Sequence, residues 1–179
     1  MDGECCFYVK IIRDSKDKTG WRVQLSFSIG LHQKDKVLLK EIKSFFGVGS
    51  LNTKHGAHSI QYRVFSIEDL EVIITHFEKY KLLTQKRADF ELWKKAFNLV
   101  KTKQHLTREG LEKIIAIKAS MNLGLPDGLK KAFPDVVPID RPLGLNQTVE
   151  DPNWLVGFTS AEGCFYIYKG KSKHHTIFF

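Results

Sequence analysis

The sequence has few cysteines and no long apolar run, and each scarcity excludes a class of protein. Its three cysteines are Cys5, Cys6 and Cys164, and they form neither a paired disulfide framework nor the spaced pairs of a zinc site. We therefore expect all three cysteines to be small apolar or strand residues of a protein in a reducing compartment. No stretch approaches the ~20 apolar residues that cross a bilayer, and the N-terminus shows no apolar signal region or Arg-rich amphipathic leader. No membrane partner is expected.

Proline is also scarce, and it is concentrated in one part of the chain. All five prolines lie between Pro126 and Pro152. Because proline interrupts helices and central strands, this composition predicts a linker over residues 124–151, with one short helical piece near Leu129 to Phe133. The chain then divides into a larger unit, residues 1–123, and a short unit, residues 152–179.

Apolar residues and positively charged residues are abundant. Hydrophobic residues make up 42% and aromatic residues 12% of the chain, as in a globular protein. The formal net charge is +8 and the pI is about 9.3, which favours a polyanionic partner, nucleic acid before membrane. Basic charge alone is a weak indication, since many proteins are basic.

The larger unit alternates between strand and helix periods. Period-two patterns predict strands over residues 6–13, 21–30, 48–52 and 59–64, and apolar spacing of 3.6 predicts helices over 35–46, 68–80, 85–103 and 107–122. The strands pair naturally as two hairpins, each with an apolar face and a polar, cationic face. This order predicts an α+β half-domain.

The short unit opens with a helix that leads into a strand. Asp151 can cap the helix and Pro152 suits its first turn, while period-two alternation begins after Gly163. Glu162 lies at the junction, where the negative end of the helix disfavours a carboxylate. A divalent cation would reverse that preference, whereas the simplest alternative is a solvated glutamate at a frayed helix end.

The same motif occurs at both ends of the chain. The segment from Ser160 to Ile167 aligns with the segment from Asp2 to Val9, with Glu, Cys, Phe and Tyr in the same register. In this alignment Glu4 corresponds to Glu162. A repeat of this spacing indicates one duplicated domain, not a short-period solenoid.

These residues resemble a known family. The segment from Trp154 to Gly163 resembles the motif helix of a LAGLIDADG homing endonuclease, and Asp2-Gly3-Glu4 resembles the last residues of a first such motif. Further similarity to the single-chain, two-motif members lies at residues 27–36, 46–49, 83–86 and 105–118. The resemblance implies an α+β half-domain with a saddle-shaped, four-stranded antiparallel sheet backed by helices. A linker and the start of a second copy are expected to follow.

The resemblance also implies a chemistry. In the family, two motif helices pack through small residues and bring one acid each to the DNA, so Glu4 and Glu162 are the expected ligands of Mg²⁺. Two carboxylates suffice, because Mg²⁺ retains several waters and also binds substrate phosphates. Lys86 is a candidate for orienting water or phosphate, against the alternative of an ordinary solvated lysine.

Specificity for double-stranded DNA is expected from the polar faces of the hairpins, since a two-stranded ribbon fits the major groove. The residues expected to meet base edges are Tyr8, Lys10, Arg22, Gln24, Ser26, Ser28, Asn52, Gln61 and Arg63. Those at the turns, expected to meet phosphates, are Arg13, Lys16, Lys18 and Lys54. For any single residue, the alternative is a solvated sheet face.

Compared with the family pattern, the first motif is expected to be truncated, Cys5 stands where the family has glycine, and the second half-domain is represented only by its helix and first strand. Origin and activity are therefore separate questions. The expected function is Mg-dependent, site-specific cleavage by a monomer of mitochondrial location, as the family implies. The alternatives are an RNA maturase that binds intron RNA and a non-functional fragment of a decayed endonuclease gene.

Overall fold

The computed structural model describes residues 3–53, 58–142 and 148–167. Its strands are β1 (Cys5–Arg13), β2 (Trp21–His32), β3 (Ser50–Thr53) and β4 (Ser59–Val64). Its α-helices are α1 (Lys36–Phe46), α2 (Ile67–Lys79), α3 (Lys86–Lys101), α4 (Arg108–Ala119), α5 (Asp127–Ala132) and α6 (Pro152–Glu162). Two short 3₁₀ turns, η1 (Gln33–Asp35) and η2 (Gln104–Leu106), precede α1 and α4. The predicted α+β order is confirmed, and element ends differ from the predicted ones by at most three residues.

The four strands form one antiparallel sheet in the order β1-β2-β4-β3. The two predicted hairpins are present: Phe7 lies opposite Phe27 in the first, and Leu51 lies opposite Tyr62 in the second. Pairing of β2 with β4, in which Phe27 also lies opposite Val64, joins the hairpins into a single surface. The sheet therefore has two edge strands, β1 and β3.

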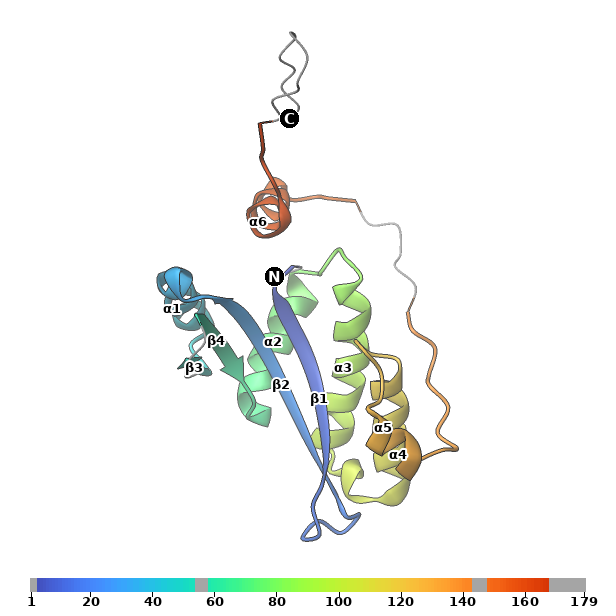
Figure 1. Cartoon of the computed structure of the whole chain (residues 1–179). Helices are drawn as coiled ribbons and strands as arrows, with labels where there is room; N and C mark the ends of the chain where they lie inside the picture. Colours follow the sequence, from blue (N-terminus) through green and yellow to red (C-terminus); the bar gives the residue numbers. More distant parts are fainter. Residues whose placement is uncertain (1–2, 54–57, 143–147, 168–179) are drawn as a thin grey trace.

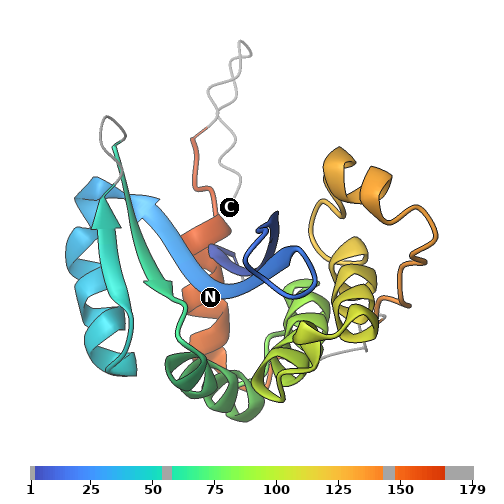
Figure 2. The same ribbon diagram turned by 90° about the horizontal axis from the view of Figure 1, so that it is seen from below.

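One face of the sheet is covered by α2 and α3, and the other face carries no helix along most of its length (Figures 1 and 2). The alternation predicted from sequence decides which residues enter the covered side. Phe7 is at the centre of the core, and its ring centroid lies 5.3–5.5 Å from those of Phe27, Phe77, Phe90 and Trp93. Edge-on and tilted aromatic packing of this kind stabilises the sheet against both helices.

Local signals set the helix ends. Ser66 and Thr107 cap α2 and α4 by accepting hydrogen bonds from backbone N–H groups three residues ahead, at 3.1 Å in each case. Gly47 ends α1 in the left-handed region, at φ 71°, which a residue without Cβ adopts at little cost. None of the helices in the described part of the chain is both long and apolar enough to span a membrane.

The proline-rich segment is packed for much of its length. Its short helix begins at Asp127, two residues before the predicted start, and the apolar residues Leu125, Leu129, Phe133, Val136 and Ile139 all pack against the core. Apolar side chains spaced along an irregular backbone gain enough burial to hold it against the first unit. The segment predicted as a linker therefore extends the core of the first half.

The strand predicted after Gly163 is not formed over residues 163–167, which have no regular structure and are exposed. A strand needs a neighbour to satisfy its backbone hydrogen bonds, and no other strand of the described residues lies beside this segment. Tyr168 and the residues after it lie outside the described part of the chain.

Candidate metal and nucleic-acid binding site

Glu162 is the last residue of α6 and is exposed. The helix begins as the sequence predicts: Asp151 Oδ1 accepts a hydrogen bond of 2.9 Å from the Asn153 N–H, and Pro152 occupies the first turn. The negative end of the helix dipole lies at Glu162 and disfavours its carboxylate. This position is therefore favourable for a cation that bridges the helix end and the carboxylate.

The fold brings Glu162 to the other end of the chain. A Cβ added to Gly3 would collide with Oε1 of Glu162 and come within 3.1 Å of its Cδ, so the carboxylate lies directly against the Gly3 backbone. Glu4 follows, exposed, immediately before β1. In Figure 1, α6 correspondingly lies beside the N-terminal end of β1. A side chain at position 3 would displace the carboxylate from this position.

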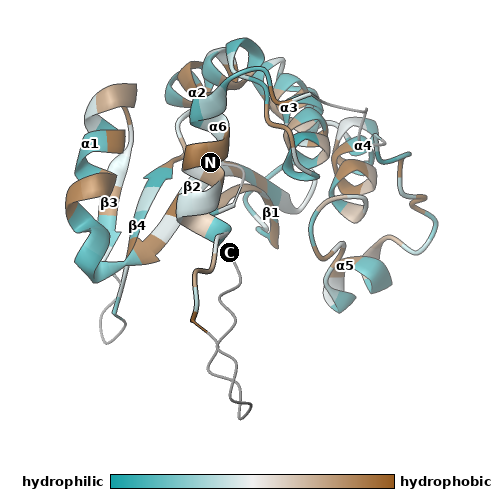
Figure 3. Cartoon of the chain, turned by 90° about the horizontal axis from the view of Figure 1, so that it is seen from above, coloured by the Kyte–Doolittle hydropathy of each residue, from teal (hydrophilic) through white to brown (hydrophobic). Residues whose placement is uncertain are grey.

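Glu4 and α6 also line one cavity, of about 990 Å³. On the α6 side, the lining consists of three small residues, Gly157, Ser160 and Ala161. On the opposite side it consists of the ends of β2 and α1, including Leu38. In Figure 3, α6 is mostly pale or apolar in colour, and its Leu155 and Val156 are exposed. The small-residue face of the helix thus lies toward the cavity that Glu4 shares.

Lys86 lies in the first turn of α3, half-buried, and its backbone N–H donates a 3.2 Å hydrogen bond to Thr84 Oγ1. Burial raises the pKa of the Cys6 thiol, while the nearby positive charges of Lys86 and Lys118 act in the opposite direction. Cys6 is two residues from Glu4 on β1. Lys86 and Lys118 therefore both lie near the strand that follows Glu4.

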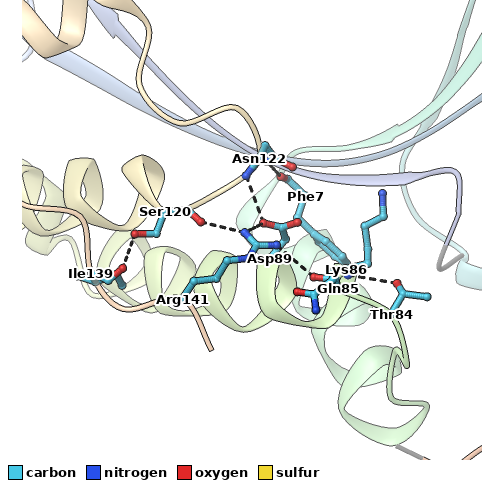
Figure 4. Close-up of polar contacts among 9 residues, drawn as sticks. All are labelled: Phe7, Thr84, Gln85, Lys86, Asp89, Ser120, Asn122, Ile139 and Arg141. Atoms are coloured by element: carbon cyan, nitrogen blue, oxygen red, sulfur yellow. Dashed lines mark hydrogen bonds and ion pairs between the residues drawn. The ribbon is translucent and has the colours of Figure 1, made fainter. Parts of the chain in front are cut away.

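A polar network fixes the start of α3 beside this strand (Figure 4). Arg141 donates hydrogen bonds to Asp89 Oδ1 at 2.7 Å, to the Ser120 carbonyl at 2.9 Å and to the Gln85 carbonyl at 3.3 Å. The Asn122 N–H also donates to Asp89 Oδ1, at 3.3 Å. The residue directly before Lys86 is thereby tied to the proline-rich segment and to the end of α4.

The open face of the sheet carries most of the residues expected to meet base edges. Tyr8, Lys10, Gln24, Asn52 and Arg63 are exposed there, while Ser26 and Gln61 are half-exposed. The register pairs Tyr8 with Ser26, Lys10 with Gln24, and Gln61 with Asn52. A hollow of about 540 Å³ is lined by six of these seven residues, Gln61 being the exception, together with apolar residues that include Val23, Phe65 and Ile67. Polar residues from both hairpins thus border one shared hollow.

Two of the predicted side chains have other environments. Ser28 is only 8% exposed, between Cys6 and Arg63 in the register. Arg22 forms an ion pair with Asp14 and lies 3.6 Å from Asp17. Ser28 offers little surface to a ligand, and Arg22 would have to leave its carboxylate partners to reach one.

The turn between β1 and β2 carries the residues expected to meet phosphates. Lys16 and Lys18 are exposed, and so is Arg13, whose guanidinium lies 5.3 Å from the Trp21 ring centroid. Lys54, expected to act in the same way, lies outside the described residues. The cations of this turn extend the positive surface beyond the strands.

Comparison with known proteins gives the family. The family description "LAGLIDADG endonuclease" matches residues 1–97. Probable intron-encoded endonuclease 3 of Neurospora crassa is 47% identical over 167 residues, which cover 92% of this chain and 31% of that protein. Probable intron-encoded DNA endonuclease aI1 of Mycosarcoma maydis is 35% identical over 88 residues, covering 48% of this chain and 72% of that protein. This chain belongs to the LAGLIDADG endonuclease family.

Solved structures agree with this assignment. The LAGLIDADG meganuclease I-CpaMI, bound to uncleaved DNA, matches with a TM-score of 0.86 and 51% identity, over 89% of this chain and 55% of its own. I-SmaMI, bound to cleaved DNA, matches with a TM-score of 0.92 and 44% identity, over 96% of this chain and 58% of its own. The LAGLIDADG half-domain fold expected from the motifs is thus confirmed, and the chain spans little more than half of these relatives.

Several residues near Lys86 and β1 are not predicted by any local pattern in the sequence. The pairing of Asp89 with Arg141 joins a helix to the proline-rich segment. Asn122 and Lys118 contact β1 from the end of α4, which local patterns do not predict either. The one available signal was that Lys118 directly follows a buried apolar run on α4. Among the described residues, no group of three or more His, Cys, Asp or Glu is arranged to hold a metal ion.

Proposed function

We propose that this chain is part of a homing-type DNA endonuclease that hydrolyses phosphodiester bonds at long, specific sites in double-stranded DNA. The observation that carries the proposal is the contact between the Glu162 carboxylate and Gly3, next to Glu4. It joins two acids from opposite ends of the chain at one end of an open, basic sheet surface. The fold of DNA-bound relatives supports the same activity.

The donor set fits Mg²⁺. Glu4 and Glu162 supply two carboxylates, and water and phosphate oxygens would complete the coordination that this ion prefers. When bound, Mg²⁺ supplies an activated water and neutralises charge on the reacting phosphate. Lys86 would orient that water or a phosphate oxygen through its ammonium group, as a positioned cation does in phosphoryl chemistry. I-SmaMI bound to an uncleaved DNA target has been solved in the presence of calcium ions, which supports a divalent cation site in this family.

The open sheet face would lie in the major groove. The exposed and half-exposed polar residues that line it present donors and acceptors at strand spacing, and Arg63 and Gln24 can make paired hydrogen bonds to base edges. Arg13, Lys16, Lys18 and Lys54 would bind phosphates at the margins. Ser28, on the same face, would contribute only if DNA binding exposes its hydroxyl. Arg22 would contribute only if DNA binding breaks its ion pair with Asp14.

Location and assembly follow from the family. We propose a mitochondrial site of action, because relatives are described as products of ND4 and cox1 introns in Podospora anserina and Schizosaccharomyces pombe. A single-chain enzyme of this family acts as a monomer, with the second half of the saddle completing the site. Intron RNA is a second polyanion that the basic sheet could hold through phosphates and 2′-OH groups.

The test is a cleavage selection. The purified chain, incubated with Mg²⁺ and a plasmid library of randomised sites, is expected to nick or cut a defined subset of sequences. Glu4→Gln and Glu162→Gln should abolish cleavage and leave duplex binding in place, whereas Glu150→Gln, an exposed acid outside the site, should cleave normally. Absence of cleavage with every divalent cation, together with binding of intron RNA, would favour a maturase. A chain that does not fold would mark a decayed fragment.

A further inference from the structure

Lys118 lies in the last turn of α4 and is not among the residues expected from the sequence to bind metal or DNA. It is half-buried, and its Nζ lies 5.1 Å from the ring centroid of Tyr8, which is exposed on the open face of the sheet. The side chain therefore reaches from the helix over the edge strand β1. Its ammonium group is at the border of the surface proposed to hold DNA.

The position of Lys118 is held by contacts to the β1 edge. Asn122, just beyond α4, donates a 3.1 Å hydrogen bond from Nδ2 to the Phe7 carbonyl. Trp93 of α3 donates one of 3.3 Å from Nε1 to the Tyr8 carbonyl. The two bonds tie the end of α4 and the middle of α3 to the backbone of β1. The end of α4 thus cannot shift relative to β1 without breaking the bond from Asn122.

Lys118 shares its surroundings with Lys86. Lys118 comes from α4 and approaches β1 at Tyr8. Lys86 comes from the start of α3, and its side chain extends toward the same strand (Figure 4). The two helices thereby each bring one cation to β1.

Lys118 also differs from neighbouring lysines in having no acidic partner. Lys94 and Lys101 of α3 and Lys113 of α4 each form an ion pair with a glutamate. Within residues 3–53, 58–142 and 148–167, no carboxylate forms an ion pair with Lys118. Burial lowers its pKa, because the charged form has lost part of its hydration. A half-buried cation without a counter-ion, at the edge of a basic surface, is a suitable partner for an external anion.

We propose that Lys118 binds a phosphate of the DNA backbone, next to the phosphate held at Glu4 and Glu162. The inference rests on the proposed function, because it takes the duplex to lie across the open sheet face. This contact would position the DNA backbone, and Lys118 would not read bases. With Lys86 it would form a two-lysine clamp on the backbone that enters the metal site.

A purely structural role predicts different behaviour, so the variants separate charge from packing. Lys118→Met keeps the aliphatic stem over Tyr8 and removes the charge, and Lys118→Gln is a second neutral variant should the first not fold. Lys118→Arg keeps the charge. Lys113→Met is the matched control, since it removes a lysine from the same helix whose ammonium is paired with Glu109.

The experiment measures Kd for a fluorescein-labelled, random-sequence DNA duplex in EDTA, as a function of salt concentration. The slope of log Kd against log salt reports the number of phosphates neutralised, so Lys118→Met should lower it by about 0.9, the value for one contact. Lys118→Arg and Lys113→Met should keep the wild-type slope. Lys118→Met should weaken DNA binding by the same factor for a selected target duplex and for a scrambled one.

The outcomes are distinguishable. Equal slopes for wild type and Lys118→Met would overturn this inference and leave the proposed function intact. A slope that falls equally in Lys113→Met would also overturn it, because net charge alone would then account for the effect. Failure of the wild-type chain to bind any duplex would overturn the inference and the proposed function together.

Discussion

Replacing Arg141 by methionine is expected to destabilise the protein by ~1–2 kcal/mol. A hydrogen bond to a charged group contributes roughly 1.5–3 kcal/mol when it is well buried. The Asp89 side chain is only 12% exposed, but that of Arg141 is 36% exposed, so solvent screens part of the interaction. The variant leaves Asp89 with a single long hydrogen bond, 3.3 Å from the Asn122 N–H, to compensate its buried charge.

The coupling between the two side chains can be isolated with Asp89→Asn and the double variant. If the ion pair causes the loss, the double variant should be less destabilised than the sum of the single variants, by about 1 kcal/mol. Lys101→Met is the control, since it breaks an ion pair whose two side chains are 50% and 46% exposed. That pair should contribute less than about 0.5 kcal/mol.

Urea denaturation followed by tryptophan fluorescence measures each free energy of unfolding. Limited proteolysis gives an independent measurement, because loss of Arg141 should release the proline-rich segment and expose it to cleavage before the core unfolds. The reasoning is refuted if the coupling energy is below about 0.3 kcal/mol, which is the usual error of additivity. It is also refuted if the segment is cleaved no faster than in the Lys101→Met control.

Three further outcomes follow from the structure. Gly3→Ala should displace the Glu162 carboxylate and reduce cleavage at least ~10-fold, since a misplacement of about 1 Å can cost more, while the unfolding free energy stays within about 0.5 kcal/mol of wild type. Gly49→Ala should cost at least ~2 kcal/mol, because its φ is +78° and a Cβ would lie 2.7 Å from a backbone oxygen of β4, whereas Gly47→Ala, at φ +71° in open space, should cost only about 1–2 kcal/mol by the same denaturation assay. Burial lowers the pKa of His76 from 6.5, so folding stability is fully present above that pH and decreases as pH falls toward the lowered value; a melting temperature that does not fall between pH 7.5 and 5, or falls equally in His76→Gln, would contradict this.

The elements of the fold could be predicted because their signals are local. Alternation along residues 59–64 correctly divided Ile60, Tyr62 and Val64 from Gln61 and Arg63, since successive side chains of a strand point to opposite faces. The cap at Thr107 and the stop at Gly47 were likewise readable, because each depends on a few consecutive residues. The repeated Glu identified the two acids.

Other features could not be predicted in this way. Nothing local indicates that β2 pairs with β4, or that the proline-rich segment packs on the core instead of hanging free. The predicted strand after Gly163 was missing over residues 163–167, because alternation shows only which face a strand could bury and says nothing about whether a neighbour is available.

The sequence by itself determined the secondary structure, the polar and apolar face of each strand, the family motif and the identity of the two candidate metal ligands. Only the tertiary structure decided that Glu162 lies against Gly3, that Arg141 pairs with Asp89, and that Lys118 reaches the edge of β1. The physical reason is that propensity, capping and alternation act over a few residues. Contacts between distant segments depend instead on how whole elements pack, and many residues determine that packing together.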